Sequence, residues 1–503
     1  MKIMKEGLDK WMLICSLLLF VFLIYRLINQ FTIVEIFPID NVANDHSAHM
    51  SKLYIFNAYG LNGFVPNWYG GFIPFKVYPP GWQIFALPIY KFTNSVQVTT
   101  YFILILSLLL GFVMLFFLSK IENFNTVKLI SFFSLFFGNA LAIGYFYRLG
   151  KYPELLGWVL FILFFSLALY YKRENKSLYP YGIFSIAIIM SLIFYIHLLV
   201  FILFSIFFIS LFLYKNKLKE RVYLILTVAL IALLTSFFWV PFLKILPTTS
   251  VGNFYPLQKL IINSNDTFYD RLTAFITPIL FLIMFLLYIK SVKYSKKEVL
   301  FYLPIIILSL LIFSRVAVYI PFINRISVDS FNLLFIFLSV FLFLKTDFKN
   351  LSILRIRIIN VLPLLLILFA LISITSSLVI TKPFQNYTPE VSNFLSLYPS
   401  INSNYLLLNP PADPHAFYAY GLVYYNLTSA GGWSPEDQSA KQEELIDTTY
   451  NDVKNSNCLS FSKHLNELKV LEVLGYKEDC TFMKLCDLSL KKEIEDSCIY
   501  TTK

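Results

Sequence analysis

Residues 178–214 decide the fold, and they read LYPYGIFSIAIIMSLIFYIHLLVFILFSIFFISLFLY. These 37 residues include no Lys, Arg, Asp or Glu. As one continuous helix they would extend about 55 Å at ~1.5 Å per residue, whereas the hydrocarbon core of a bilayer is about 30 Å thick. The stretch is too long for one transmembrane helix, so it predicts two, with the turn near His197.

The rest of the chain is also rich in apolar residues. Of its 503 residues 58% are hydrophobic and 14% are charged, and its mean hydropathy is +0.68. Soluble proteins carry roughly 25% charged residues. With 53 Phe and 33 Tyr, the chain has more bulky apolar side chains than a soluble core encloses. This composition predicts an integral membrane protein and excludes a cytosolic enzyme, a nucleic-acid-binding module and a disordered protein.

Six clusters of basic residues separate the apolar stretches. They are Lys2/Lys5/Lys10, Lys120/Lys128, Lys172/Arg173/Lys176, Lys215/Lys217/Lys219/Arg221, Lys290/Lys293/Lys296/Lys297 and Lys345/Lys349/Arg355/Arg357. If all six are cytoplasmic, as the positive-inside rule expects, an even number of spans separates successive clusters. Together with residues 178–214, the apolar runs then predict eleven transmembrane helices: 11–28, 98–119, 129–147, 154–171, 222–243, 272–289, 299–314, 328–344 and 358–380.

The charge balance changes at about residue 380. Residues 1–380 carry a net charge of +17, whereas residues 381–503, called the tail below, carry −6. Basic residues near membrane ends report orientation and contact with anionic lipids rather than with nucleic acid. We therefore predict a transmembrane domain at 1–380, anchored by its first span rather than preceded by a cleaved signal peptide. The N-terminus is expected in the cytoplasm and the tail outside it.

The tail has the composition of a small α/β domain. Three successive leucines at 406–408 predict a buried strand, and residues 465–474 predict a short helix. Four of the five cysteines lie here, namely Cys458, Cys480, Cys486 and Cys498. An even number of cysteines in a segment placed outside by its charge predicts two disulfides of unknown connectivity. Free or metal-bound thiols are the alternative.

Ionisable side chains gather at the predicted outer ends of the helices. A charged group near hydrocarbon costs roughly 2.5 kcal/mol or more unless it is paired or hydrated, so its presence there calls for a reason. The main examples are Arg26, Asp40, Asp45, His46, His49, Arg148, Lys151, Glu154, His197, Arg315, Arg325 and Asp329. We therefore expect a functional site at the outer face of the membrane.

Residues 35–97, called the first loop below, hold the most informative motifs. Asp45 is followed four residues later by His49, and an amphipathic stretch covers residues 50–59. Tyr and Trp at this density suit the lipid headgroup zone, and the Pro-Pro and Gly-Gly steps predict a folded loop at the interface rather than a linker. The later motifs are Gly63-x-x-Pro66-x-Trp68, Gly70-Gly71 and Tyr78-Pro79-Pro80.

With these motifs the chain resembles the GT-C membrane glycosyltransferases. More narrowly, it resembles the uncharacterised integral membrane proteins labelled as related to 6-pyruvoyl-tetrahydropterin synthase, a label that we do not read as pterin chemistry. The turn at 148–154, RLGKYPE, and Gly431-Gly432-Trp433 of the tail are also similar. The resemblance covers most of residues 35–200. It implies a GT-C-like polytopic helical fold.

The resemblance also implies an activity. The expected activity is that of a plasma-membrane glycosyltransferase that would move a sugar from a polyprenyl phosphate or diphosphate to a glycan, lipid or protein acceptor at the outer face. Elementary reasoning supports the same donor. Nucleotide sugars stay in the cytoplasm, so an external site needs a donor that crosses the bilayer, and a lipid carrier supplies one.

Such a transfer requires a base for the acceptor hydroxyl. By resemblance Asp45 is the candidate base or acceptor-orienting carboxylate, and the alternative is an N-cap for a helix that begins at His46. His46 and His49 either share the proton or form structural hydrogen bonds.

The transfer also requires cations for the departing phosphate. Arg148, Lys151, Arg315 and Arg325 lie in short outer turns and are the candidates, with ordinary contact to lipid phosphates as the alternative. Glu154 opens a helix, where an acid complements the helix dipole. The remaining site candidates are Asp40, Glu154, His197, Tyr78 and Asp329.

The sequence also bears on a metal cofactor and on two other functional classes. The outer loops contain no Asp-x-Asp or Glu-x-Asp pair, so we expect no metal, and a divalent ion held by Asp40, Asp45 and Asp329 is the alternative. A transporter or flippase of lipid-linked sugars would place charges and helix breaks at the bilayer midplane. A non-catalytic subunit of a cell-surface polysaccharide assembly system is the third class.

Overall fold

A computed structural model describes residues 2–39, 44–76, 78–173, 176–245, 255–264, 267–292, 295–348, 351–353, 356–380, 386–433 and 439–502. Within these residues, seven helical stretches are long and apolar enough to cross a membrane. They lie in α1 (Lys2–Gln30), α5 (Val96–Glu122), α8 (Tyr152–Lys172), α12 (Leu218–Ile245), α13 (Phe268–Ser291), α15 (Val328–Lys345) and α16 (Ile358–Val379). The protein is thus a polytopic helical membrane protein, as predicted.

The other predicted spans are also helical, but they are broken, shorter or, in one case, charged at one end. The run at 129–147 is a bent pair, α6 (Thr126–Phe137) and a second part at Ala140–Arg148, which meet at 50°. That second part contains α7 (Ala140–Ala142) and η1 (Ile143–Arg148), a π-helix. The run at 299–314 corresponds to α14 (Lys296–Phe313), with Ser314 as its C-cap.

Residues 178–214 form two helical segments that meet at His197, where the sequence predicts the turn. The first is α9 (Tyr181–Ile196), and the second is α10 (Leu198–Phe204) followed by α11 (Ile206–Tyr214). His197 has an extended backbone, and its Nδ1 accepts a hydrogen bond of 3.4 Å from the backbone N–H of Val200. The histidine therefore ends one helix and caps the next.

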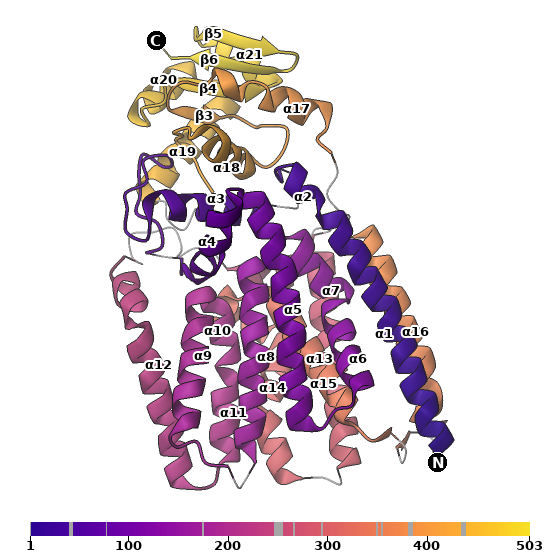
Figure 1. Cartoon of the computed structure of the whole chain (residues 1–503). Helices are drawn as coiled ribbons and strands as arrows, with labels where there is room; N and C mark the ends of the chain where they lie inside the picture. Colours follow the sequence, from indigo (N-terminus) through magenta and orange to yellow (C-terminus); the bar gives the residue numbers. More distant parts are fainter. Residues whose placement is uncertain are drawn as a thin grey trace.

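Basic clusters lie together at the end of the bundle opposite the tail (Figure 1). Lys172 lies 2.6 Å from Glu298, and Lys345 lies 2.7 Å from Glu122. Lys215 donates to the backbone carbonyl of Lys176 at 3.0 Å. These contacts join the ends of α5, α8, α14 and α15 and the α11–α12 turn at one end of the bundle.

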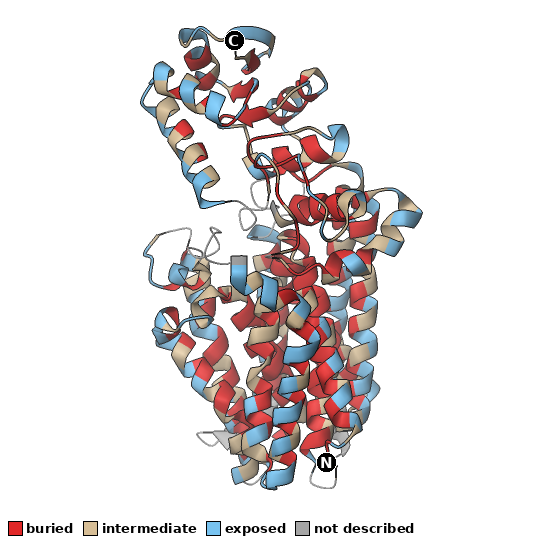
Figure 2. Cartoon of the chain, turned by 90° about the vertical axis from the view of Figure 1, so that its left-hand side faces the viewer, coloured by how far each residue is buried: buried red, intermediate tan, exposed pale blue. Residues whose placement is uncertain are grey.

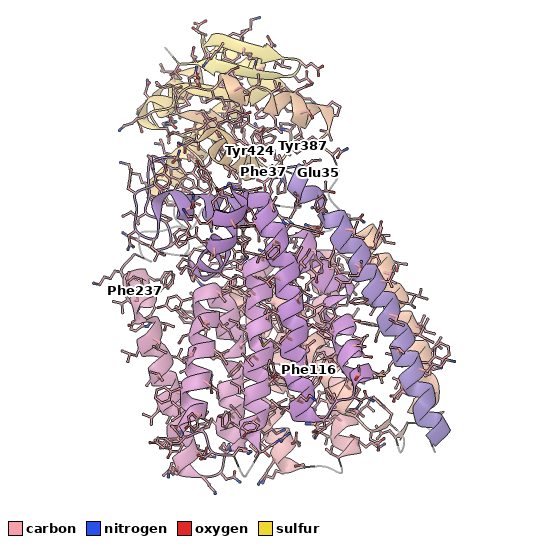
Figure 3. The ribbon with its side chains drawn as sticks, in the orientation of Figure 1. Glu35, Phe37, Phe116, Phe237, Tyr387 and Tyr424 are labelled. Carbon is pink, nitrogen blue, oxygen red and sulfur yellow. A yellow bond between two sulfur atoms is a disulfide. The ribbon has the colours of Figure 1, made fainter. Side chains whose placement is uncertain are left out.

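Large apolar side chains face outward along the bundle. Phe237 on α12 is 72% exposed, and Figure 3 shows it pointing away from the other helices. Figure 2 shows exposed residues along the outer surface of the helices and buried ones between them. Exposed apolar side chains of this kind suit contact with lipid.

The first loop forms a layer between the bundle and the tail (Figure 1). Its helices are α3 (Asn44–Tyr59) and α4 (Gly81–Thr93), and the short helix α2 (Thr32–Glu35) leads into it. Phe37 lies beneath the tail beside Tyr387 and Tyr424, as Figure 3 shows. The Tyr387 hydroxyl donates to the Phe37 carbonyl at 2.6 Å, and the Phe37 and Tyr424 rings are 5.7 Å apart.

The described part of the tail contains a four-stranded mixed sheet of order β3-β4-β6-β5. The strands are β3 (Tyr405–Leu407), β4 (Glu472–Tyr476), β5 (Ser489–Ile494) and β6 (Ser497–Thr501), with β3 and β4 parallel and the other pairs antiparallel. Its helices are α17 (Pro389–Leu395), α18 (Pro414–Tyr425), α19 (Ala440–Lys454), α20 (Cys458–Glu467) and α21 (Glu478–Leu485). Two disulfides, Cys458–Cys486 and Cys480–Cys498, join these elements.

The predicted helix at 465–474 is wrong. α20 ends at Glu467, and Lys469 has a positive φ of 55°, which turns the chain. Residues from 472 onward then pair with β3 and β6. The apolar run Val473-Leu474 is therefore part of a central strand, a case that periodicity in a short run cannot distinguish from a helix.

The two faces of the sheet belong to different hydrophobic cores. Tyr405, Leu407 and Ile499 pack with first-loop residues such as Trp68 and Phe72. The alternate residues of the same strands, including Leu406, Val473 and Tyr500, pack with α19, α20 and α21. One core is thus shared between the first loop and the tail, because side chains alternate between the faces of a strand.

Candidate active site

Asp45 and Lys151 form an ion pair between the first loop and the bundle. Asp45 lies in the first turn of α3, which begins one residue earlier at Asn44, and Lys151 immediately precedes α8. Both side chains are largely shielded, with 14% and 31% exposed. Burial opposes the charge on Lys151, but the neighbouring carboxylates, first Asp45 and then Glu154, outweigh it and raise the pKa of Lys151. The lysine is therefore held as a cation beside an acid.

His46 fastens α3 to the turn that carries Lys151. Its Nε2 donates to the backbone carbonyls of Tyr147, at 2.9 Å, and Arg148, at 3.1 Å. With that nitrogen as donor, Nδ1 accepts from the Tyr152 hydroxyl. His46 is fully buried, and burial lowers its pKa to about 3. Both ring nitrogens of His46 are thus engaged with the turn and with Tyr152.

His49 lies one turn further along α3 in an aromatic surround. Its ring centroid is 5.6 Å from that of Trp82 and 6.4 Å from that of Tyr78. His49 is 6% exposed, and its buried Nδ1 has no hydrogen-bond partner among the described residues. Burial, together with the charge of Lys52, lowers its pKa well below 6.5. His49 is thus a neutral imidazole whose free nitrogen can bond to a ligand.

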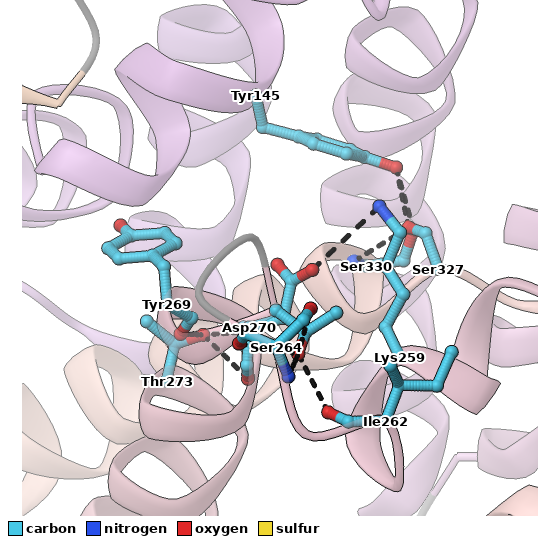
Figure 4. Close-up of polar contacts among 11 residues, drawn as sticks. Tyr145, Lys259, Ile262, Ser264, Tyr269, Asp270, Thr273, Ser327 and Ser330 are labelled. Atoms are coloured by element: carbon cyan, nitrogen blue, oxygen red, sulfur yellow. Dashed lines mark hydrogen bonds and ion pairs between the residues drawn. The ribbon is translucent and has the colours of Figure 1, made fainter.

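Glu154 and His197 join the same cluster from α8 and the α9–α10 turn. His197 Nε2 lies 3.6 Å from Glu154 Oε1, and that oxygen accepts from the Tyr145 hydroxyl at 2.6 Å. Ser330 donates to Glu154 Oε2 at 2.9 Å. Figure 4 shows the Tyr145 hydroxyl directed at Ser327 and Ser330. Glu154 therefore connects α8 to the start of α15.

Asp329 lies at the start of α15, next to this network. It interacts electrostatically with Asp270, Glu154 and Lys151. Lys259 Nζ is 3.8 Å from Asp270 Oδ2, a contact that Figure 4 shows. Asp329 thus lies near the cluster, and a second acid and lysine, Asp270 and Lys259, lie next to it.

The predicted arginines fall in two places. Arg148 is 4% exposed and lies at the end of η1, close enough to buried Arg26 of α1 for the two to repel each other. Arg315 is exposed on the α14–α15 loop, with a positive φ of 63°. Arg325 lies on the same loop with its guanidinium 5.3 Å from the centroid of Tyr255. Of the three, only Arg148 thus lies on the turn that carries Lys151.

Other residues of the cluster were not singled out from the sequence. Lys52, one turn after His49, is 5% exposed and places its Nζ 3.9 Å from the centroid of the Tyr78 ring. Tyr152 and Tyr145 bind His46 and Glu154. The i, i+3 spacing of His49 and Lys52 was the available signal. Asp40 lies outside the described residues, among which no group of three or more His, Cys, Asp or Glu side chains is placed to hold a metal ion.

Comparisons with known proteins place the fold. No family model and no curated protein matches the chain. It is similar to the arabinofuranosyltransferase AftD from Mycobacteria, with a TM-score of 0.60, 12% identity and coverage of 96% of this chain and 40% of AftD. The oligosaccharyltransferase of Archaeoglobus fulgidus with a tethered acceptor peptide gives a TM-score of 0.51, 9% identity and coverage of 96% and 74%. At such identities the similarity shows the GT-C-like fold alone, and the chain spans less than half the length of AftD.

Proposed function

We propose that the protein is a membrane glycosyltransferase that transfers a sugar from a polyprenyl-phosphate-linked donor to an acceptor at the outer face of the membrane. The observation that carries the proposal is the cluster at the tail end of the bundle. There an acid and a neutral histidine of α3, Asp45 and His49, lie with Lys151, the residue just before α8. The GT-C-like fold supports this reading. The narrower relationship to the membrane proteins labelled as related to 6-pyruvoyl-tetrahydropterin synthase is part of the proposal.

The topology follows from the same arrangement. Counting α9, α10–α11, α14 and the bent α6 pair as crossings gives eleven, with the basic end in the cytoplasm and the first loop and tail outside. Residues 1–380 are then the transmembrane domain and residues 381–503 an extracytoplasmic domain. An external site cannot use cytoplasmic nucleotide sugars, so the donor is carried on a lipid. Disulfides in the tail suit this side of the membrane.

The ion pair suggests how the reaction proceeds. When the donor binds, its phosphate competes for Lys151, and Asp45 is released from its partner. The acceptor hydroxyl attacks the anomeric carbon and gives its proton to Asp45, while the bond from that carbon to the phosphate oxygen breaks. The polyprenyl phosphate leaves with the electron pair. Lys151 and Arg148 then stabilise the developing negative charge.

The other residues have supporting functions in this proposal. His49 uses its free Nδ1 to bond to a substrate hydroxyl. Glu154 and His197 orient the α8 end of the site through their contact. Arg315 and Arg325 are further candidates for binding the donor phosphate or lipid headgroups. Tyr78 and Asp329 form part of the wall around the site.

The test measures transfer of radiolabelled sugar from polyprenyl-phosphate donors with purified protein in nanodiscs. We expect Asp45→Asn and Lys151→Met each to reduce transfer by about 100-fold or more, because each removes a group that acts in the transition state. Asp9→Asn, in α1 at the opposite end of the bundle, is the matched control and keeps wild-type transfer. Full activity of Asp45→Asn would overturn the assignment of the base. Movement of unchanged donor across the bilayer, with no product, would show a flippase instead.

A further inference from the structure

A cavity of about 790 Å³ lies where the tail meets the first loop. Tyr69 lines it from the first loop, and α18 and α19 line it from the tail. The volume falls in the range of about 300–1,000 Å³ that is typical of small-molecule sites. Asp45 and Lys151 do not line the cavity, so it is separate from the cluster described above.

One face of α19 supplies a polar wall. The residues that line the cavity are spaced by three or four positions, which places them on a single side of a helix. Glu444, directly beside one of them, does not line the cavity. The polar residues of the wall are Glu443, Asp447, Asn451 and Lys454.

Aromatic rings from α18 and α19 form another part of the lining. Tyr418 and Tyr450 both line the cavity, and their hydroxyls are engaged elsewhere. The Tyr450 hydroxyl donates to the carbonyl of Leu407, and the Tyr418 hydroxyl accepts from the N–H of the same residue, each at 3.0 Å. These rings are therefore fixed by β3, as is expected of a preformed binding surface.

The charges of the lining favour one class of ligand. Two carboxylates, Glu443 and Asp447, outnumber the single ammonium of Lys454. Burial and the charge of Asp447 raise the pKa of Glu443, so the two acids lie close together on the α19 face. Acceptor groups of this kind suit ligands rich in O–H donors and repel phosphates and uronates. A peptide backbone presents N–H donors and C=O acceptors in equal number, so a peptide site would need as many donors as acceptors in its lining.

We propose that this cavity binds a neutral oligosaccharide, with its hydroxyls on the α19 wall and the apolar faces of its sugar rings on the tyrosines. Its place beside the first loop makes the ligand the acceptor end of a growing glycan. That last assignment rests on the proposed function, whereas the binding itself does not.

Binding is tested with the full chain in nanodiscs on an array of neutral, acidic and amino-sugar oligosaccharides, followed by calorimetry of the best neutral glycan. We expect neutral glycans to bind and hexagalacturonate not to bind. Asp447→Ala and Tyr69→Ala should weaken binding by about 10-fold or more, since each removes a direct contact. Glu444→Ala, on the same helix but off the cavity face, should bind like wild type.

Three results of the binding experiment would contradict the proposed glycan site. Absence of neutral-glycan binding, tighter binding of hexagalacturonate, or binding of peptides alone would overturn the proposal. In transfer assays Asp447→Ala should raise the KM for the acceptor and leave kcat unchanged, whereas Asp45→Asn lowers kcat. Glycan binding without any transfer would refute the proposed function and leave the binding site standing.

Discussion

His46 and His49 are buried histidines whose pKa values lie below the ordinary range. Burial lowers the pKa of His46 to about 3 and that of His49 well below 6.5. In the unfolded chain each titrates near pH ~6.5. Below this pH the unfolded state therefore binds protons at these histidines, whereas the folded state does not. Their contribution to stability is complete above pH ~6.5 and is lost progressively as the pH falls below that value.

We predict that the protein loses about 2 kcal/mol of stability per histidine between pH 7 and pH 5. Thermal unfolding in detergent over this range measures it. His49→Gln should reduce the dependence of the unfolding temperature on pH, and the His46→Gln/His49→Gln double variant should reduce it further. If the double variant is too unstable to purify, His49→Gln alone decides. An unchanged slope would contradict neutral burial of these rings.

At the scale of elements, the turn between η1 and α8 depends on Gly150. Its φ is +72°, and a Cβ at this position would lie 2.6 Å from the buried His46 ring. Gly60 has nearly the same φ, +71°, with nothing within 4 Å of its Cβ position. A comparison of substitutions at the two glycines therefore separates the cost of backbone strain from that of a steric clash.

We predict that Gly60→Ala costs about 1–2 kcal/mol, the cost of a left-handed conformation for a residue with a side chain. Gly150→Ala should cost more, because it also displaces the ring that holds the carbonyls of Tyr147 and Arg148. It should also reduce sugar transfer, since Lys151 moves with the turn. Unfolding temperatures and transfer rates of both variants check this. Equal effects of the two substitutions would show that contact with His46 is unimportant.

The elements that the sequence predicts well are those set by local patterns. The apolar runs between basic clusters are helices, because hydrocarbon thickness and backbone hydrogen bonding act within one segment. The function of His46 was left open, since the sequence shows a histidine near an acid but not the carbonyls of Tyr147 and Arg148, about one hundred residues away. The pairing of Asp45 with Lys151 and the contribution of Lys52 likewise depend on how α3 packs on the bundle.

At the scale of the whole molecule, the first loop and the tail share one core. Asn67 joins them, with its side chain accepting from the Tyr59 hydroxyl at 2.7 Å and donating to the carbonyl of Asn426 at 3.1 Å. The backbone carbonyl of Asn67 also accepts from the N–H of Ser429 at 2.7 Å. A Cβ on Gly432 would lie 2.7 Å from the Trp68 ring, so the tail fits closely over the loop. The opposite face of the sheet has its own core and both disulfides.

We therefore predict that the two cores loosen independently. Asn67→Ala, which leaves buried hydrogen-bonding groups unsatisfied at a cost of about 1–3 kcal/mol, should speed hydrogen exchange in the first loop and α18 but not in β5 and β6. Asn404→Ala is the matched control, because the Asn404 side chain donates to the carbonyls of Leu468 and Lys469 on the other side of the sheet. It should speed exchange around the α20–β4 turn and leave the first loop protected. Faster hydrogen exchange throughout the tail in Asn67→Ala would contradict this prediction. It would mean that the second core of the tail is not stable without its contacts to the first loop.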